Sequence, residues 1–223
     1  MATLTLLGIQ NLVRSALNEP STSSGIVTST ELTAAINDGY KDVAAKALCY
    51  EAIVTKDNIP ASVKLVSLIG SNVVRVNYAE YYISSASGGR GVMNQLPNIF
   101  GHRTPDDYTP HWWFQWGDFL IVDPSPDVAT YDLNLYCSCY PAAVLTNPTD
   151  IPSSLPSEFL EDIIQFATSR IAFKLKRWND AAMAYNRYIV SVQRKRYEYV
   201  AKNMDHYQLT KIPGSVTTEQ AAR

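Results

Sequence analysis

Cysteine is scarce in this sequence, with only Cys49, Cys137 and Cys139 among 223 residues. An odd and small number of cysteines excludes a disulfide framework. Cys137 and Cys139 are two positions apart, roughly 6.5–7 Å along a strand, which is too far for them to pair without distortion. We therefore expect all three thiols to be reduced, which fits synthesis in a cytoplasm.

An excess of either charge is also missing, because the formal net charge is −2. Such a balance gives no overall signature of a nucleic-acid binder or of a protein bound to a membrane surface. No segment approaches the ~20 apolar residues that a membrane-spanning helix needs. The first residues, MATLTLLGIQNLVRSALNE, contain no positive leader, so we expect neither a signal peptide nor a membrane anchor.

Motifs that carry chemistry are absent as well. The sequence has no P-loop, no GxGxxG and no GxSxG motif. Its histidines, His102, His111 and His206, are scattered without the spacing of metal ligands. Turn formation explains the acidic pair Asp106-Asp107, which follows a proline, better than acid–base chemistry does. We predict a protein that is not an enzyme and that holds neither a cofactor nor a metal.

The sequence does contain strand-like segments in its middle, most clearly from His111 to Pro141. Gly117-Asp118 predicts a two-residue hairpin turn between the first two strands of this stretch. Its third strand, Tyr131 to Tyr140, alternates apolar and polar residues. The expected core face of that strand consists of Leu133, Leu135, Cys137 and Cys139.

Further strands are expected upstream of that stretch. Segments 63–69 and 73–83 are rich in Val, Ile and Tyr, which favours strands. Segment 91–110 is ambiguous and allows a short helical turn at 92–96, followed by an irregular crossing with three prolines.

The aromatic cluster Trp112-Trp113-Phe114-Gln115-Trp116 allows two interpretations. Exposed tryptophans stack on sugars or bases, which would make a carbohydrate- or ligand-binding module. Alternatively, both faces of the sheet are buried, one against helices and one against another subunit. Consecutive residues of a strand point to opposite faces, so only one of Trp112 and Trp113 can share a face with Trp116. We favour packing for Trp112, Trp113 and Trp116, together with Leu133 and Leu135.

Helical patterns lie on both sides of the strands. The expected helices span about 4–18, 30–49, 157–178 and 181–205. Thr28-Ser29-Thr30-Glu31 has the pattern of a capping box at the start of the second helix. The third helix is apolar on two sides, which indicates burial against more than one neighbour.

These elements predict an α+β fold: mainly a bundle of four helices, with an antiparallel β-sheet portion inserted at about 51–141 and an extended C-terminal tail. Residues 1–206 would form a single domain. The tail, 207–223, contains Pro213-Gly214 and has no reason to be ordered by itself.

The last expected helix combines basic residues with tyrosines. Nine lysines and arginines outnumber six acidic residues between positions 156 and 206. Such a stripe is compatible with DNA binding or with a solvated helix face, but interleaved tyrosines are commoner at wet protein interfaces. The candidates for a subunit interface or a lumen surface are Arg187, Tyr188, Arg194, Lys195, Arg196 and Tyr199.

Four patterns in this order resemble the head-to-tail adaptor (head-completion, or connector) proteins of tailed bacteriophages. They are TxxEL…INDGYKDVA from Thr28 to Ala44, PSPDVATYDLNLYCSCYP from Pro124 to Pro141, LPSEFLEDIIQFATSRIAFKL from Leu155 to Leu175, and the final basic, tyrosine-rich helix. The resemblance covers about residues 4 to 205. The sequence departs from the family's PxPdaxYxLxLxYYxxP run by having Cys137-Ser138-Cys139 before Tyr140.

The resemblance implies a structural virion protein at the head–tail interface, or neck, made in the host cytoplasm. Its subunits, usually twelve, would form a ring beneath the portal protein, with a tail or nozzle protein on the far side. Genomic DNA would pass through the lumen without sequence-specific contacts, and no membrane is involved. The C-terminal segment would clamp the portal, with Tyr207, Leu209, Ile212, Val216 and Arg223 as candidate docking residues.

Overall fold

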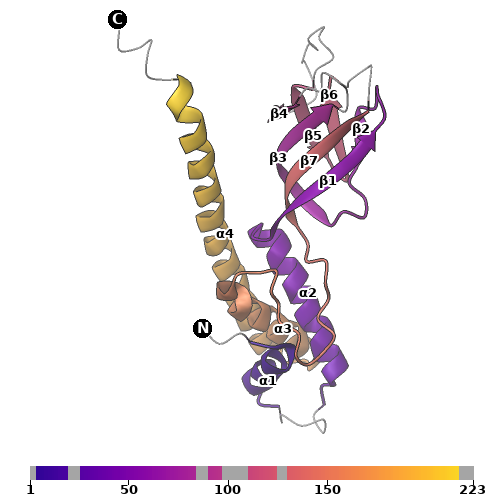
Figure 1. Cartoon of the computed structure of the whole chain (residues 1–223). Helices are drawn as coiled ribbons and strands as arrows, with labels where there is room; N and C mark the ends of the chain where they lie inside the picture. Colours follow the sequence, from indigo (N-terminus) through magenta and orange to yellow (C-terminus); the bar gives the residue numbers. More distant parts are fainter. Residues whose placement is uncertain (1–3, 20–25, 84–89, 97–109, 125–129, 216–223) are drawn as a thin grey trace, which may run out of the picture. The chain divides into compact units, whose positions relative to one another are not determined.

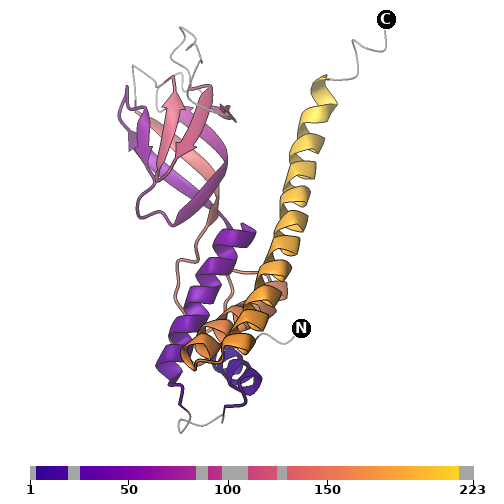
Figure 2. The ribbon, with the colours of Figure 1, turned by 180° about the vertical axis from the view of Figure 1, so that it is seen from behind.

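The computed structural model describes residues 4–19, 26–83, 90–96, 110–124 and 130–215. It divides into two compact units. The helical unit is built from both ends of the chain, residues 1–49 and 143–223, and the sheet unit from residues 50–142. Figure 1 shows both units, and Figure 2 shows them from behind.

The helical unit contains α1 (Leu6–Ala16), α2 (Ser29–Ala47), a short 3-10 turn (Ser157–Phe159), α3 (Leu160–Lys174) and α4 (Trp178–Ser215). The capping box predicted at the start of α2 is confirmed. The Glu31 backbone N–H donates to Thr28 Oγ1 at 3.3 Å, and the Thr28 backbone N–H donates to Glu31 Oε2 at 3.1 Å. These two bonds satisfy amide groups that the helix itself leaves unpaired.

Helix α3 lies at the centre of the helical unit and packs against α1, α2 and α4. Its buried apolar residues include Ile163, Ala167 and Ile171, which explains why a helix apolar on two sides is found here. Gly39 of α2 permits a close approach, because a Cβ atom there would lie 3.0 Å from Phe166 Cδ1 and 3.3 Å from the Ile163 carbonyl oxygen.

The sheet unit is a seven-stranded mixed sheet with strand order β1-β7-β3-β4-β5-β6-β2. The strands are β1 (Glu51–Ile59), β2 (Leu65–Ser67), β3 (Val73–Ile83), β4 (Arg90–Gln95), β5 (Trp112–Trp116), β6 (Phe119–Asp123) and β7 (Tyr131–Cys139). One core contains residues of both edge strands, Ile59 of β1 and Val66 of β2, so the sheet must curl round on itself. The result is a nearly closed barrel (Figures 1 and 2).

Hydrophobic alternation determines which side of the sheet faces this core. Leu133, Leu135, Cys137 and Cys139 of β7 are all buried inside, as predicted. The Gly117-Asp118 hairpin is confirmed too. Gly117 has φ +57°, a left-handed conformation that glycine adopts without steric cost.

The predicted fold class, mainly a four-helix bundle with an inserted antiparallel sheet and an extended tail, is wrong. The strands form a barrel-like unit with a core of its own, so the sheet is not an accessory to a bundle. The sheet is not purely antiparallel, because β4 and β5 pair in parallel with Asn94 opposite Trp112. That pairing joins segments separated along the chain, and local sequence patterns carry no signal for it.

Two local expectations also fail. Residues 92–96 do not form a helical turn, because Arg90–Gln95 is strand β4, paired with β3 on one side and β5 on the other. The chain after Tyr207 is not extended from that point, since α4 continues to Ser215. Every helix in the described ranges is too short or too polar to cross a membrane.

Candidate assembly surfaces

Helix α4 carries a buried seam on the side that faces the other helices. Ala181, Ala184, Tyr188 and Val192, at steps of three and four, have almost no exposed surface. The Tyr188 hydroxyl donates a hydrogen bond to Asp42 of α2, and Lys46 lies 2.8 Å from the same carboxylate oxygen. Burial and this hydrogen bond to Asp42 raise the pKa of Tyr188 above its ordinary value. Tyr188 therefore anchors α4 to α2 inside the unit.

Two turns beyond Tyr188, Lys195 is held by α3 and by the 3-10 turn that precedes α3. Its ammonium group lies 2.6 Å from Asp162 Oδ2 and 2.5 Å from the Glu158 carbonyl oxygen. The Asp162 side chain is 2% exposed and that of Lys195 is 14% exposed. A carboxylate buried this deeply requires a partner charge, so this ion pair determines how α4 docks on α3.

The opposite side of α4 is exposed and has a different character. Met183, Val190 and Tyr197 recur every seven residues, which places them on one side, about half a turn from the buried seam. Their side chains are 55%, 67% and 78% exposed. Arg187 and Arg194, also exposed, flank this row. We call these five residues the α4 stripe.

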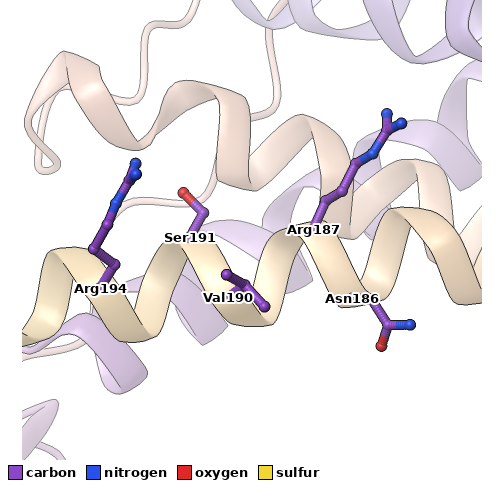
Figure 3. A pocket seen from close by; sticks show the side chains of 5 residues that line it. All are labelled: Asn186, Arg187, Val190, Ser191 and Arg194. Atoms are coloured by element: carbon purple, nitrogen blue, oxygen red, sulfur yellow. The ribbon is translucent and has the colours of Figure 1, made fainter.

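The middle of the α4 stripe forms a shallow, open hollow lined by Asn186, Arg187, Val190, Ser191 and Arg194 (Figure 3). In that view Arg187 and Arg194 extend to the same side of the helix, whereas Asn186 points away from them. An exposed apolar row bordered by two guanidinium groups is typical of protein interfaces, which are enriched in aromatic residues, methionine and arginine.

Six residues were predicted for a subunit interface or a lumen surface, and the structure separates them. Arg187, Arg194 and Arg196 are exposed. Tyr188 is buried and Lys195 is partly buried, and both contact other elements of the same unit. The side chain of Tyr199 lies outside the described residues, although its backbone belongs to α4.

The candidate docking residues at the C-terminus are only partly within the described chain. Tyr207, Leu209 and Ile212 belong to α4 by their backbone, and their side chains lie outside the described residues. Val216 and Arg223 also lie outside them.

The tryptophan cluster is divided by the pleat of β5. Trp113 is buried in the core of the sheet unit, as are Leu133 and Leu135. Trp112 is half-buried and Trp116 is exposed, both on the other side of the strand.

A second surface lies on the outside of the sheet unit, where β1, β7, β3 and β4 run side by side. Ile53 of β1, Tyr136 of β7 and Tyr78 of β3 form one row across three strands. The rings of Tyr78 and Tyr136 meet edge to face, with centroids 5.3 Å apart. Ile53, on the edge strand of this face, is 61% exposed. We call it the outer sheet face.

The sequence analysis predicted neither the α4 stripe nor the outer sheet face as the structure shows them. The signal for the α4 stripe was available, because Met183, Val190 and Tyr197 are seven residues apart. The prediction of an interface rested on the basic residues and tyrosines of this helix instead. One of them, Tyr188, is buried inside the helical unit. The outer sheet face depends on strands brought together by the barrel, so no local pattern marks it.

Among the described residues, no three His, Cys, Asp or Glu side chains are grouped in a way that would hold a metal ion.

The family model described as SU10 adaptor protein matches residues 4–209, which is most of the chain and spans both units. No curated protein matches the sequence.

Proposed function

We propose that this chain, which belongs to the SU10 adaptor protein family, forms a ring that joins the portal to the tail of a bacteriophage. Membership of the family makes the chain a structural adaptor protein of a bacteriophage virion. The ring, its twelve copies and its place in the neck are the part that we propose. Portal and tail or nozzle proteins would be its partners, with the genome passing through the lumen.

The observation that best supports this proposal is the two-sided character of α4. Its 38 residues exceed the 19 of α2 and the 15 of α3, the helices against which it packs. One side is anchored by Tyr188 and Lys195, and the other presents the exposed α4 stripe. A subunit that must bind neighbours needs such a surface beyond its own core.

Assembly with the portal tests the ring directly. Purified chain, alone and mixed with portal rings, should give a ring of about twelve copies by native mass spectrometry and electron microscopy. A chain that stays monomeric in both conditions would contradict the proposal.

We further propose that the C-terminal segment from Tyr207 to Arg223 docks on the portal. Because Asp205 lies beyond the described buried seam of α4, Ala181 to Val192, a chain ending at Asp205 should keep its melting temperature and lose portal binding. A full-length chain with 206–223 in scrambled order serves as the matched control for length and composition, and it should also fail to bind. Unchanged binding of the truncated chain would rule out this role.

A further inference from the structure

The α4 stripe and the outer sheet face have complementary chemistry. Arg187 and Arg194 of the stripe are exposed guanidinium groups beside an apolar row. On the outer sheet face, acidic residues border the row of Ile53, Tyr136 and Tyr78. The acidic residues are Glu51, Asp57, Glu80 and Asp132.

The sheet register shows how this acidic border is arranged. Glu80 of β3 is opposite Asn134 of β7, which in turn is opposite Thr55 of β1. This second row lies directly beside the row that contains Tyr136. On its other side, Glu80 is paired with Val92 of β4, which is 54% exposed.

Hydrogen bonds hold two of these acidic groups, Glu80 and Asp132, in place. The Tyr82 hydroxyl donates to Glu80 Oε2 at 3.1 Å, and the Tyr78 hydroxyl lies 3.4 Å from Glu80 Oε1. Asp132 Oδ1 accepts a bond of 2.6 Å from the Asn58 backbone N–H. Arg75 is the one basic side chain among the described outward-facing residues of β3. It lies in the row of Ser138 and Glu51, away from Glu80.

We infer that the α4 stripe of one copy docks on the outer sheet face of a neighbouring copy. The apolar row of the stripe would cover Ile53 and Tyr136, and Arg187 and Arg194 would face the acidic border. This inference rests on the proposed ring and deepens it, because it names the two surfaces that meet between neighbours.

Charge favours contact of the α4 stripe with the outer sheet face of a neighbour over contact with a second α4 stripe. Two stripes facing each other would bring the arginines of both copies together, and like charges in an interface are strongly unfavourable. A contact between two different surfaces is also heterologous, and repetition of such a contact closes a ring when the rotation allows it.

The test reverses charge on each surface separately and then mixes the two variants. The first variant is Arg187→Glu with Arg194→Glu. The second is Thr55→Lys with Asp57→Lys, which changes two exposed side chains of the outer sheet face and leaves Glu80 and Asp132 in place. In the first variant the new glutamates meet the acidic border, and in the second the arginines meet two added lysines, so the assembled fraction of each variant should fall at least about tenfold.

A one-to-one mixture of the two variants should assemble again. The acidic stripe of the first variant then meets the added lysines of the second, and the native stripe of the second meets the native sheet face of the first. Restoration by mixing requires the two surfaces to lie on different copies. Native mass spectrometry should show both variants in one particle in equal numbers.

A charge-matched control and a covalent test accompany the mixture. Lys41→Glu with Lys176→Glu changes exposed residues of the helical unit away from the stripe and should assemble like the wild type. In the covalent test, a Val190→Cys chain is mixed with an Ile53→Cys chain and oxidised. Disulfide-linked heterodimers are expected if the two surfaces meet. The three native cysteines are buried and should not compete for oxidation.

The outcomes separate this inference from the proposed ring. Variants that fold by circular dichroism and assemble like the wild type, or a mixture that does not restore assembly, would overturn the inference and leave the ring standing. Variants that form free rings and fail only to join the portal would overturn it as well, by assigning the stripe to the portal. A wild-type chain that never assembles would overturn both.

Discussion

Burial of the Tyr131 side chain makes the stability of the sheet unit depend on pH. It has no exposed surface, and its hydroxyl donates to the Val63 carbonyl oxygen at 2.5 Å. Burial raises the pKa of Tyr131 from 10.0 to about 12. The unfolded chain ionises first as pH rises, so the stabilisation from this group is complete below about pH 10 and is lost as pH rises towards 12.

Replacing Tyr131 by phenylalanine should therefore weaken the alkaline loss of stability. The free energy of unfolding of the wild type should fall more between pH 8 and pH 11.5 than that of Tyr131→Phe, by about 2 kcal/mol. Urea unfolding at the two pH values, followed by near-ultraviolet circular dichroism, measures the difference. Equal losses in the two proteins would show that Tyr131 does not titrate in this way.

Lys195 illustrates the opposite case, a buried charge that needs its partner. Lys195→Met should lower the free energy of unfolding of the helical unit by roughly 3–5 kcal/mol, because Asp162 would stay buried without its counter-charge. Lys41→Met is the matched control at an exposed helical position and should change stability by less than about 0.5 kcal/mol. If both variants unfold at the same urea concentration, the ion pair does not hold α4.

At the scale of elements, the packing of α2 on α3 depends on the small size of Gly39. Gly39→Val should destabilise the helical unit by about 1–3 kcal/mol, since its methyl groups have no room beside Phe166 and the Ile163 carbonyl oxygen. Ala34→Val is the control for a valine at an exposed position of the same helix, where no close approach occurs. Thermal unfolding that is equal in the two variants would contradict the close approach.

Local elements also show what sequence reasoning predicts well. The capping box of Thr28 and Glu31 and the alternation of β7 involve residues within a few positions of each other, so their physics is contained in the local sequence. Strand β4 was missed because its pairing with β5 joins Asn94 to Trp112 across a long interval of chain. The seven-residue spacing of Met183, Val190 and Tyr197 marks one side of α4, but only packing decides that Tyr188 is inside and Val190 outside.

At the scale of the whole molecule, the division into two units predicts separate folding. The ends of the sheet unit meet, because the Cys139 backbone N–H donates to the Tyr50 carbonyl oxygen at 2.8 Å. Residues 50–142 expressed alone should therefore fold to a sheet-rich protein with a cooperative thermal transition.

The matching chain, with 50–142 replaced by a short glycine–serine linker, should keep the helical circular dichroism signal. It should also lose assembly if the outer sheet face is one half of the contact between copies. A sheet fragment that stays unfolded, while the linker chain remains helical, would show that the sheet unit depends on the helices.

The sequence by itself determined the local elements, the core face of β7 and the resemblance to phage adaptors, because each depends on short-range periodicity or an ordered set of motifs. Only the tertiary structure decided that the strands curl into a unit with its own core. It also decided that Tyr188 and Lys195 are used inside the chain, leaving the α4 stripe and the outer sheet face exposed. The physical reason is that burial depends on segments far apart in the chain, and no window of the sequence contains both partners of such a contact.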